Sequence, residues 1–107
     1  MVSYSTMALE EAGAFAVVLE AIPHRLGAYI TSRLKRAPTI GIGAGAQTSG
    51  QVLVWDDMLG TWSGHKAKFV RRFGDVRSEI ERGVKGYTEE VRARSFPGEA
   101  EIYAPKD

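Results

Sequence analysis

The chain has no cysteine, and this absence excludes several kinds of chemistry at once. Without thiols there is no disulfide, no thiolate metal site and no cysteine nucleophile, and nothing is learned about the compartment. Long hydrophobic runs are also missing, since none approaches the ~20 apolar residues of a membrane-spanning helix. Residues Met1 to Tyr4 lack a basic region followed by an apolar core, so we expect no secretory signal.

A strong excess of charge of either sign is missing as well, because the formal net charge is only +1. We therefore expect neither a nucleic acid nor a membrane surface as a partner. The composition is that of an ordinary soluble protein, with 44% hydrophobic and 25% charged residues. At 107 residues, the chain amounts to one domain at most.

The first half predicts a strand, a helix and a second strand. A short helix over residues 3–12, stopped by Gly13, precedes a continuous apolar run over residues 14–19. This run lacks polar alternation, which predicts a strand covered on both faces. A helix from Pro23 to about residue 36 and a strand over residues 39–42 then complete a βαβ pattern with short connections.

Candidate functional residues follow the two strands. Glu20 comes directly after the first, and a carboxylate at the carboxyl end of a buried strand is a candidate catalytic group. A plainer interpretation is that Glu20 only complements the dipole of the helix that begins near Pro23. Gly43 and Gly45 follow the second strand and allow a substrate or another backbone to approach closely. Their spacing also fits a dinucleotide fingerprint, but the helix and distal acid that it needs are missing.

The segment after these glycines is ambiguous. Val52 to Trp55 is strongly β-prone, and we favour a strand there over a helix that is capped by Ser49 and runs through Leu59. Asp56 and Asp57 can supply oxygen ligands to Mg²⁺, but adjacent strand residues point to opposite faces. A structural ion pair or cap is therefore the preferred interpretation for both carboxylates.

The remaining residues predict helices. Apolar residues recur at spacings of three and four in one stripe, which we expect to be core: Phe69, Phe73, Val76, Ile80, Val84, Tyr87 and Val91. Asp75 is expected to cap the second helical segment. His24 and His65 are expected at the surface. A run of basic residues is expected to form a solvated face: Lys66, Lys68, Arg71 and Arg72.

Three apolar strands cannot close on themselves, so the fold class is α/β with an incomplete sheet. A (β/α)8 barrel takes ~250 residues, and this chain is less than half of that. The pattern predicts either the last three strands and closing helices of such a barrel, or an unusually small α/β domain.

At these motifs, and over nearly the whole chain, the sequence closely resembles ketopantoate hydroxymethyltransferases. The matching segments lie in the family's order: Ala8–Phe15, Val18–Glu20 with Pro23, Pro38–Gly45, Gly50–Trp55, Asp57–Gly60, Lys68–Val70 and Phe96–Glu99. Asp56 departs from the pattern, since relatives have histidine or glutamine there, which argues against a fixed catalytic role at that position.

The resemblance implies a (β/α)8 TIM barrel of the phosphoenolpyruvate/pyruvate type, of which residues 1–107 would be the C-terminal part. It implies hydroxymethyl transfer from 5,10-methylenetetrahydrofolate to 3-methyl-2-oxobutanoate, giving 2-dehydropantoate for pantothenate biosynthesis. Mg²⁺ would be the metal, and the partners would be the small 2-oxo acid, the folate co-substrate and further copies or the rest of a barrel. The cytoplasm is the implied compartment, or the mitochondrion in a eukaryote.

Glu20 falls on the glutamate that the family is thought to use as the base. No residue here matches the family's Mg²⁺-binding aspartates, so the metal ligands are expected to be absent from this chain and the chain alone to be inactive. Two alternatives stay open: a non-catalytic barrel remnant that acts as a structural or partner-binding chain, and a lyase of the same superfamily. The segment from Lys68 to Glu99 argues against the lyase.

Overall fold

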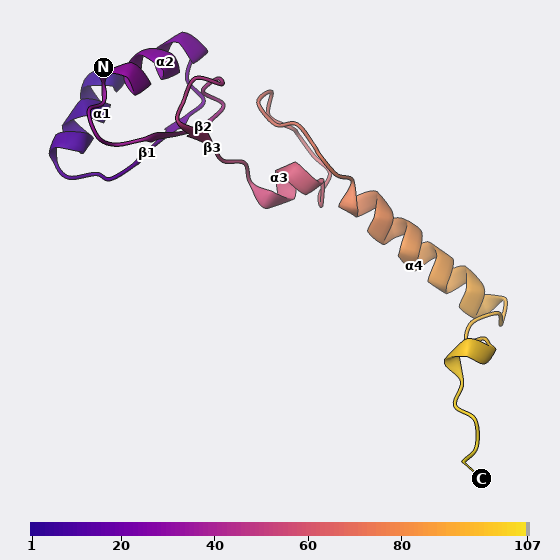
Figure 1. Ribbon diagram of the computed structural model, residues 1–107. Coiled ribbons are helices and arrows are strands. Elements are labelled where there is room, and N and C mark those ends of the chain that lie inside the picture. The colour runs from indigo at the N-terminus through magenta and orange to yellow at the C-terminus, as the bar shows by residue number, and fades with distance from the viewer. Residues whose placement is uncertain (107) are drawn as a thin grey trace.

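A computed structural model describes residues 1–106 (Figure 1). The elements in chain order are α1 (Val2–Glu11), β1 (Val17–Glu20), α2 (His24–Arg33), β2 (Thr39–Ile42), β3 (Gly50–Gln51), α3 (Trp55–Leu59), α4 (Val76–Arg92) and a 3₁₀ turn, η1 (Glu99–Glu101). No helix among these residues is long and apolar enough to cross a membrane.

The three strands form one parallel sheet in the order β1–β2–β3. Val17 to Glu20 of β1 pair in register with Thr39 to Ile42 of β2. The predicted β–α–β arrangement of β1, α2 and β2 is therefore confirmed, with β2 at the predicted bounds. Helix α2 ends at Arg33, earlier than expected, because Leu34 is already extended.

The sheet has one buried and one open face. Val17, Leu19 and Thr39 are buried, and Val17 and Leu19 form a small core with Ile30 of α2. The alternate residues Val18 and Glu20 are exposed and point to the opposite face. The expectation that both faces of the first strand are covered is wrong for the described part of the chain, because no element there packs on the second face.

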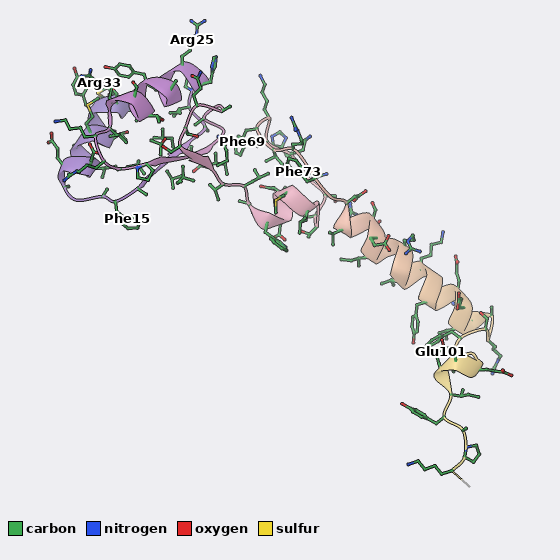
Figure 2. The ribbon with its side chains drawn as sticks, in the orientation of Figure 1. Phe15, Arg25, Arg33, Phe69, Phe73 and Glu101 are labelled. Carbon is green, nitrogen blue, oxygen red and sulfur yellow. The ribbon has the colours of Figure 1, made fainter. Side chains whose placement is uncertain are left out.

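Strand β1 is also shorter than predicted. It begins at Val17, and Phe15, which we expected inside the strand, is 91% exposed before it (Figure 2). The backbone ladder explains this boundary, because the amide of Val17 donates to the carbonyl of Pro38 and no earlier residue of this run is paired with β2. The continuous apolar run therefore predicted that a strand lies in this region, but it did not predict that the strand begins at Val17.

Glu10 ties α1 to the connection between α2 and β2. Its carboxylate accepts backbone N–H bonds from Lys35 (3.0 Å), Arg36 (2.6 Å) and Ala37 (2.8 Å). These bonds, with that from Ala37 the most effective, lower the pKa of Glu10 to about 2. The side chain is buried, and the clasp fixes the chain just before β2 begins.

The segment after β2 differs from the prediction. The chain crosses to β3 through a loop over residues 43–49, and β3 is only Gly50–Gln51. Val52 still donates to the carbonyl of Gly41, but Trp55 begins helix α3. The predicted strand over residues 52–55 is thus wrong, because β-prone side chains need a further strand to pair with and none lies there in the described residues. Ser49 caps no helix, and its hydroxyl accepts from the amide of Thr39.

Helix α4 is the largest element. Asp75 caps it as predicted, with its side chain accepting from the amide of Ser78. The apolar stripe, however, is not core: Ile80, Val84 and Tyr87 are exposed, because α4 extends away from the sheet (Figure 1). Phe69 and Phe73 belong to the preceding loop rather than to a helix. The described chain is accordingly elongated, with extents of 74 × 35 × 18 Å.

Candidate active site at the carboxyl ends of the strands

Glu20 is the last residue of β1 and lies on the open face of the sheet. It pairs in register with Ile42, the last residue of β2, so both side chains stand on the same face at the carboxyl end. The chain turns sharply after it, since Ala21 has a positive φ of 52° and donates to the carbonyl of Ile42. Glu20 is exposed, and a small molecule can reach its carboxylate.

Gly43 and Gly45 form the turn that follows β2. Both have positive φ, 66° and 82°, a backbone conformation that glycine adopts without strain. A β-carbon at Gly43 would lie 2.7 Å from Cδ1 of Phe69, so only glycine lets that ring close over the end of β2. This contact was not predictable from the helical spacing of Phe69.

Gln51 holds the glycine turn in place. Its side-chain amide donates to the carbonyl of Gly45 (2.8 Å) and to the hydroxyl of Thr48 (3.0 Å). Sequence reasoning placed Gln51 in a strand without giving it a role. A polar residue that begins an apolar run beside a glycine-rich turn was the available signal.

Two hollows flank this end of the sheet. One, of about 420 Å³, is lined by β2, residues 51–53, α3 and the loop before α4: Ile42, Gly43, Gln51, Val52, Leu53, Met58, Phe69, Arg71 and Phe73. Glu20 borders a different hollow, of about 410 Å³, between β1 and α1. The structure thus brings Gly43 and Gly45 together around Phe69, and it does not place Glu20 in the same hollow.

Asp56 and Asp57 lie in the first turn of α3 and have structural partners. Asp56 accepts from the hydroxyl of Thr61 (2.7 Å), and Asp57 accepts from the indole N–H of Trp62 (3.0 Å). These bonds support a structural role, although they are hydrogen bonds to neutral side chains rather than the predicted ion pair or cap. Across residues 1–106 no three His, Asp or Glu side chains lie close enough together to hold a metal ion.

The remaining titratable residues lie at the surface. His24 is the first residue of α2 and His65 lies in the loop before α4, and both are exposed as predicted. The basic run Lys66, Lys68, Arg71 and Arg72 is exposed in the same loop.

Comparison with known proteins places this arrangement in a family. Residues 2–99 match the family described as ketopantoate hydroxymethyltransferase, and the chain belongs to that family. The resemblance inferred from the sequence motifs is therefore confirmed.

Curated relatives agree with this assignment. A 3-methyl-2-oxobutanoate hydroxymethyltransferase of Chlorobaculum tepidum is 56% identical over 95 residues, which are 89% of this chain and 34% of that protein. Proteins of the same name from Mycobacterium sp. (strain KMS) and Erythrobacter litoralis are 51% and 52% identical over 90% and 92% of the chain, and 34% of each is covered. The chain thus spans about a third of the length of the curated relatives it matches.

Proposed function

We propose that this chain is part of an enzyme that transfers a hydroxymethyl group from 5,10-methylenetetrahydrofolate to 3-methyl-2-oxobutanoate, giving 2-dehydropantoate for pantothenate biosynthesis. The observation that carries the proposal is the family match over residues 2–99, which includes Glu20 and the glycine turn. The relatives share the name of this activity at 51–56% identity.

We further propose that residues 1–107 form the C-terminal part of a (β/α)8 barrel. The parallel sheet with its helix-covered and open faces supports this, because a barrel has helices outside and strands facing one another inside. Val18 and Glu20 on the open face would then face the interior of the barrel.

Glu20 is the proposed base, which removes the proton from C3 of the 2-oxo acid. Its place at the carboxyl end of β1 is where barrel enzymes carry catalytic groups, and its exposure leaves the carboxylate free to accept a proton. Gly43 and Gly45 are proposed to let the substrate approach the backbone at the end of β2. Overall, the transfer consumes one water and releases tetrahydrofolate.

The described residues do not by themselves fit a Mg²⁺ site, because no group of three suitable side chains lies among residues 1–106. Mg²⁺, if it is used, needs ligands from other residues, and no step here is assigned to it. We therefore expect the isolated chain to show no transferase activity, since a carboxylate alone does not stabilise the enolate that proton removal creates.

The base assignment can be tested in a chimera in which residues 2–99, the span of the family match, replace the corresponding segment of the Chlorobaculum tepidum relative. We expect the chimera to exchange the C3 proton of 3-methyl-2-oxobutanoate in D₂O, followed by proton NMR. Glu20→Gln should slow exchange about 10²–10⁴-fold, the usual contribution of a general base. Glu11→Gln, an exposed carboxylate on α1, is the matched control and should exchange at the parent rate.

A folded chimera without exchange would contradict the proposed activity, and an unchanged rate in Glu20→Gln would contradict the role of Glu20. The alternative function, a structural or partner-binding chain, is favoured by the exposed stripe of α4 and would be supported by the first of these outcomes. As partners we propose further copies of the chain or the rest of a barrel. The named relatives come from bacteria, which have no mitochondria, and this supports the cytoplasm as the compartment.

A further inference from the structure

Gln51 ties the loop after β2 to the start of β3. Its side-chain nitrogen donates to the carbonyl of Gly45 (2.8 Å) and to the hydroxyl of Thr48 (3.0 Å), which uses both of its N–H groups. The hydroxyl of Thr48 donates in turn to the carbonyl of Gly50, the residue before Gln51 (2.8 Å). Residues 43–49 form no helix or strand, so these side-chain bonds are what fixes the loop to the sheet.

The place of Glu20 depends on the backbone around it. Its side chain is exposed and takes part in none of the hydrogen bonds found among residues 1–106. Ala21, directly after it, has a φ of 52°, which is uncommon for a residue other than glycine. The amide of Ala21 donates to the carbonyl of Ile42 (2.9 Å), and this bond holds the turn against β2. The orientation of Glu20 is therefore determined by β2 and by the residues that follow β2.

Helix α2, which begins soon after Glu20, packs closely on the same glycine turn. A β-carbon at Gly45 would overlap Cβ of His24, the first residue of α2. A β-carbon at Gly27 of α2 would lie 2.5 Å from the carbonyl oxygen of Ala44, which is itself buried. Because these contacts leave no free space, a displacement of the turn would also displace the first turns of α2 and the end of β1.

Gln51 and Glu20 stand on opposite faces of the sheet. Gln51 is the register partner of Gly41, and Gly41 is the partner of Leu19, whose side chain is buried on the helix-covered face. Glu20 is the next residue of β1 and lies on the open face. We propose that Gln51 is a positioning residue for Glu20, which acts through the glycine turn and α2 without contacting the substrate. This inference rests on the proposed function, in which Glu20 is the base.

The test removes the two donors of Gln51 and follows the step that Glu20 performs. Gln51→Met keeps the length of the side chain and loses both N–H groups. In the chimera we expect this variant to exchange the C3 proton of 3-methyl-2-oxobutanoate about 10–100-fold more slowly, since a misplacement of about 1 Å costs ~10²-fold. Gln51→Glu, which replaces the donors by acceptors in the same shape, should also be slower than the parent.

A double-mutant cycle shows whether the effect passes through Glu20. In the Glu20→Gln background there is no base to misplace, so adding Gln51→Met should change the remaining exchange rate by less than about twofold. Gln47→Met is the matched control, because Gln47 is an exposed glutamine of the same loop that takes part in no hydrogen bond found in the described chain. It should exchange at the parent rate, and circular dichroism verifies that all variants fold.

A second measurement needs no activity. Hydrogen–deuterium exchange, followed by mass spectrometry, is compared between parent and Gln51→Met in this chain and in the chimera. Residues 21–27, which include the bonded amide of Ala21, should exchange about fivefold faster in the variant, the ratio expected when one hydrogen bond is lost. Residues 2–11 of α1, which make no contact with Gln51, should exchange at the parent rate.

Three results would overturn the inference: an unchanged rate in Gln51→Met, an equal loss in Gln47→Met, or an equal loss with and without Glu20. The last of these would show that the turn acts on the substrate itself rather than on the base. Unchanged hydrogen exchange over residues 21–27 would also overturn it. A parent chimera without C3 exchange contradicts the proposed activity instead, and hydrogen exchange then still decides whether Gln51 holds this segment, so the two failures are observed separately.

Discussion

Glu10 shows how a single side chain can join segments that are distant in the sequence. Its carboxylate accepts from three successive amides, Lys35, Arg36 and Ala37, more than twenty residues away. Amides that precede a strand otherwise need water or another acceptor, and the clasp satisfies them in a buried position. Because the clasp lies at the amino end of β2, we interpret Glu10 as a stabilising residue, in contrast to Glu20 at the opposite end of the sheet.

The pH dependence of stability should reveal this clasp. The pKa of Glu10 in the folded chain, about 2, is below the ordinary value of 4.5, so its contribution is complete above pH 4.5 and is lost as the pH falls toward 2. Glu10→Gln should lower the urea midpoint at neutral pH and flatten the profile over that window. Glu11→Gln, its exposed neighbour, should do neither. Equal midpoints for the two variants at neutral pH would contradict the role of Glu10.

At the scale of elements, two glycines in helices face opposite environments. Gly27 of α2 packs on the loop after β2, where an added β-carbon would lie 2.5 Å from the carbonyl oxygen of Ala44. Gly83 of α4 has no atom within 4 Å of the corresponding position. Close packing is therefore required at Gly27 and is absent at Gly83, which simply weakens its helix.

Substitution by alanine should change the free energy of unfolding in opposite directions at the two positions. Gly27→Ala should destabilise the sheet and its helices by about 1–3 kcal/mol, the usual cost of overpacking, which exceeds the gain in helix propensity. Gly83→Ala should stabilise α4 by about 0.5–1 kcal/mol. Urea unfolding followed by circular dichroism measures both changes. A neutral or stabilising Gly27→Ala would show that α2 does not pack as closely on this loop as described.

Whether the sequence predicted an element depended on how far apart in the chain its interacting residues lie. The bounds of β2 and the Asp75 cap were predictable, because they depend on residues a few positions apart. The segment Val52–Trp55 was not, since its β propensity is realised only with a further strand. The exposure of Ile80 and Val84 was also missed, because periodicity shows that a stripe needs covering but not what covers it.

The candidate site was predictable to a similar degree. Glu20 ends β1, and Gly43 and Gly45 follow β2, and strand ends are detectable from local pattern. The contacts of Gly43 with Phe69 and of Gly45 with Gln51 depend on folding of distant segments, so sequence reasoning missed them.

The molecule as a whole is far more extended than its length requires. Its radius of gyration is 23.9 Å, whereas a compact chain of this size has about 13 Å. Helix α4 accounts for much of this extension, since it shares no substantial interface with the sheet (Figure 1). Large apolar side chains on α4 and one face of the sheet consequently remain in water.

We therefore expect the chain to self-associate, because burial of this apolar surface is favourable. Light scattering coupled to gel filtration should show oligomers or a broad distribution. Ile80→Lys combined with Val84→Lys should shift the chain toward a monomer. Glu90→Lys makes the same change in net charge away from the apolar stripe and should not. A sharp, monodisperse monomer for the parent chain would contradict this expectation.

The exposed stripe of α4 also has a consequence for the lifetime of the chain in a cell. Chaperones and proteases act on proteins that leave apolar segments uncovered, and abundance responds to such exposure. The half-life of this chain should then be determined by how soon another surface covers Ile80, Val84 and Tyr87, rather than by the stability of the small sheet. The steady-state amount of the chain would increase or decrease with the concentration of the protein surface that covers these side chains.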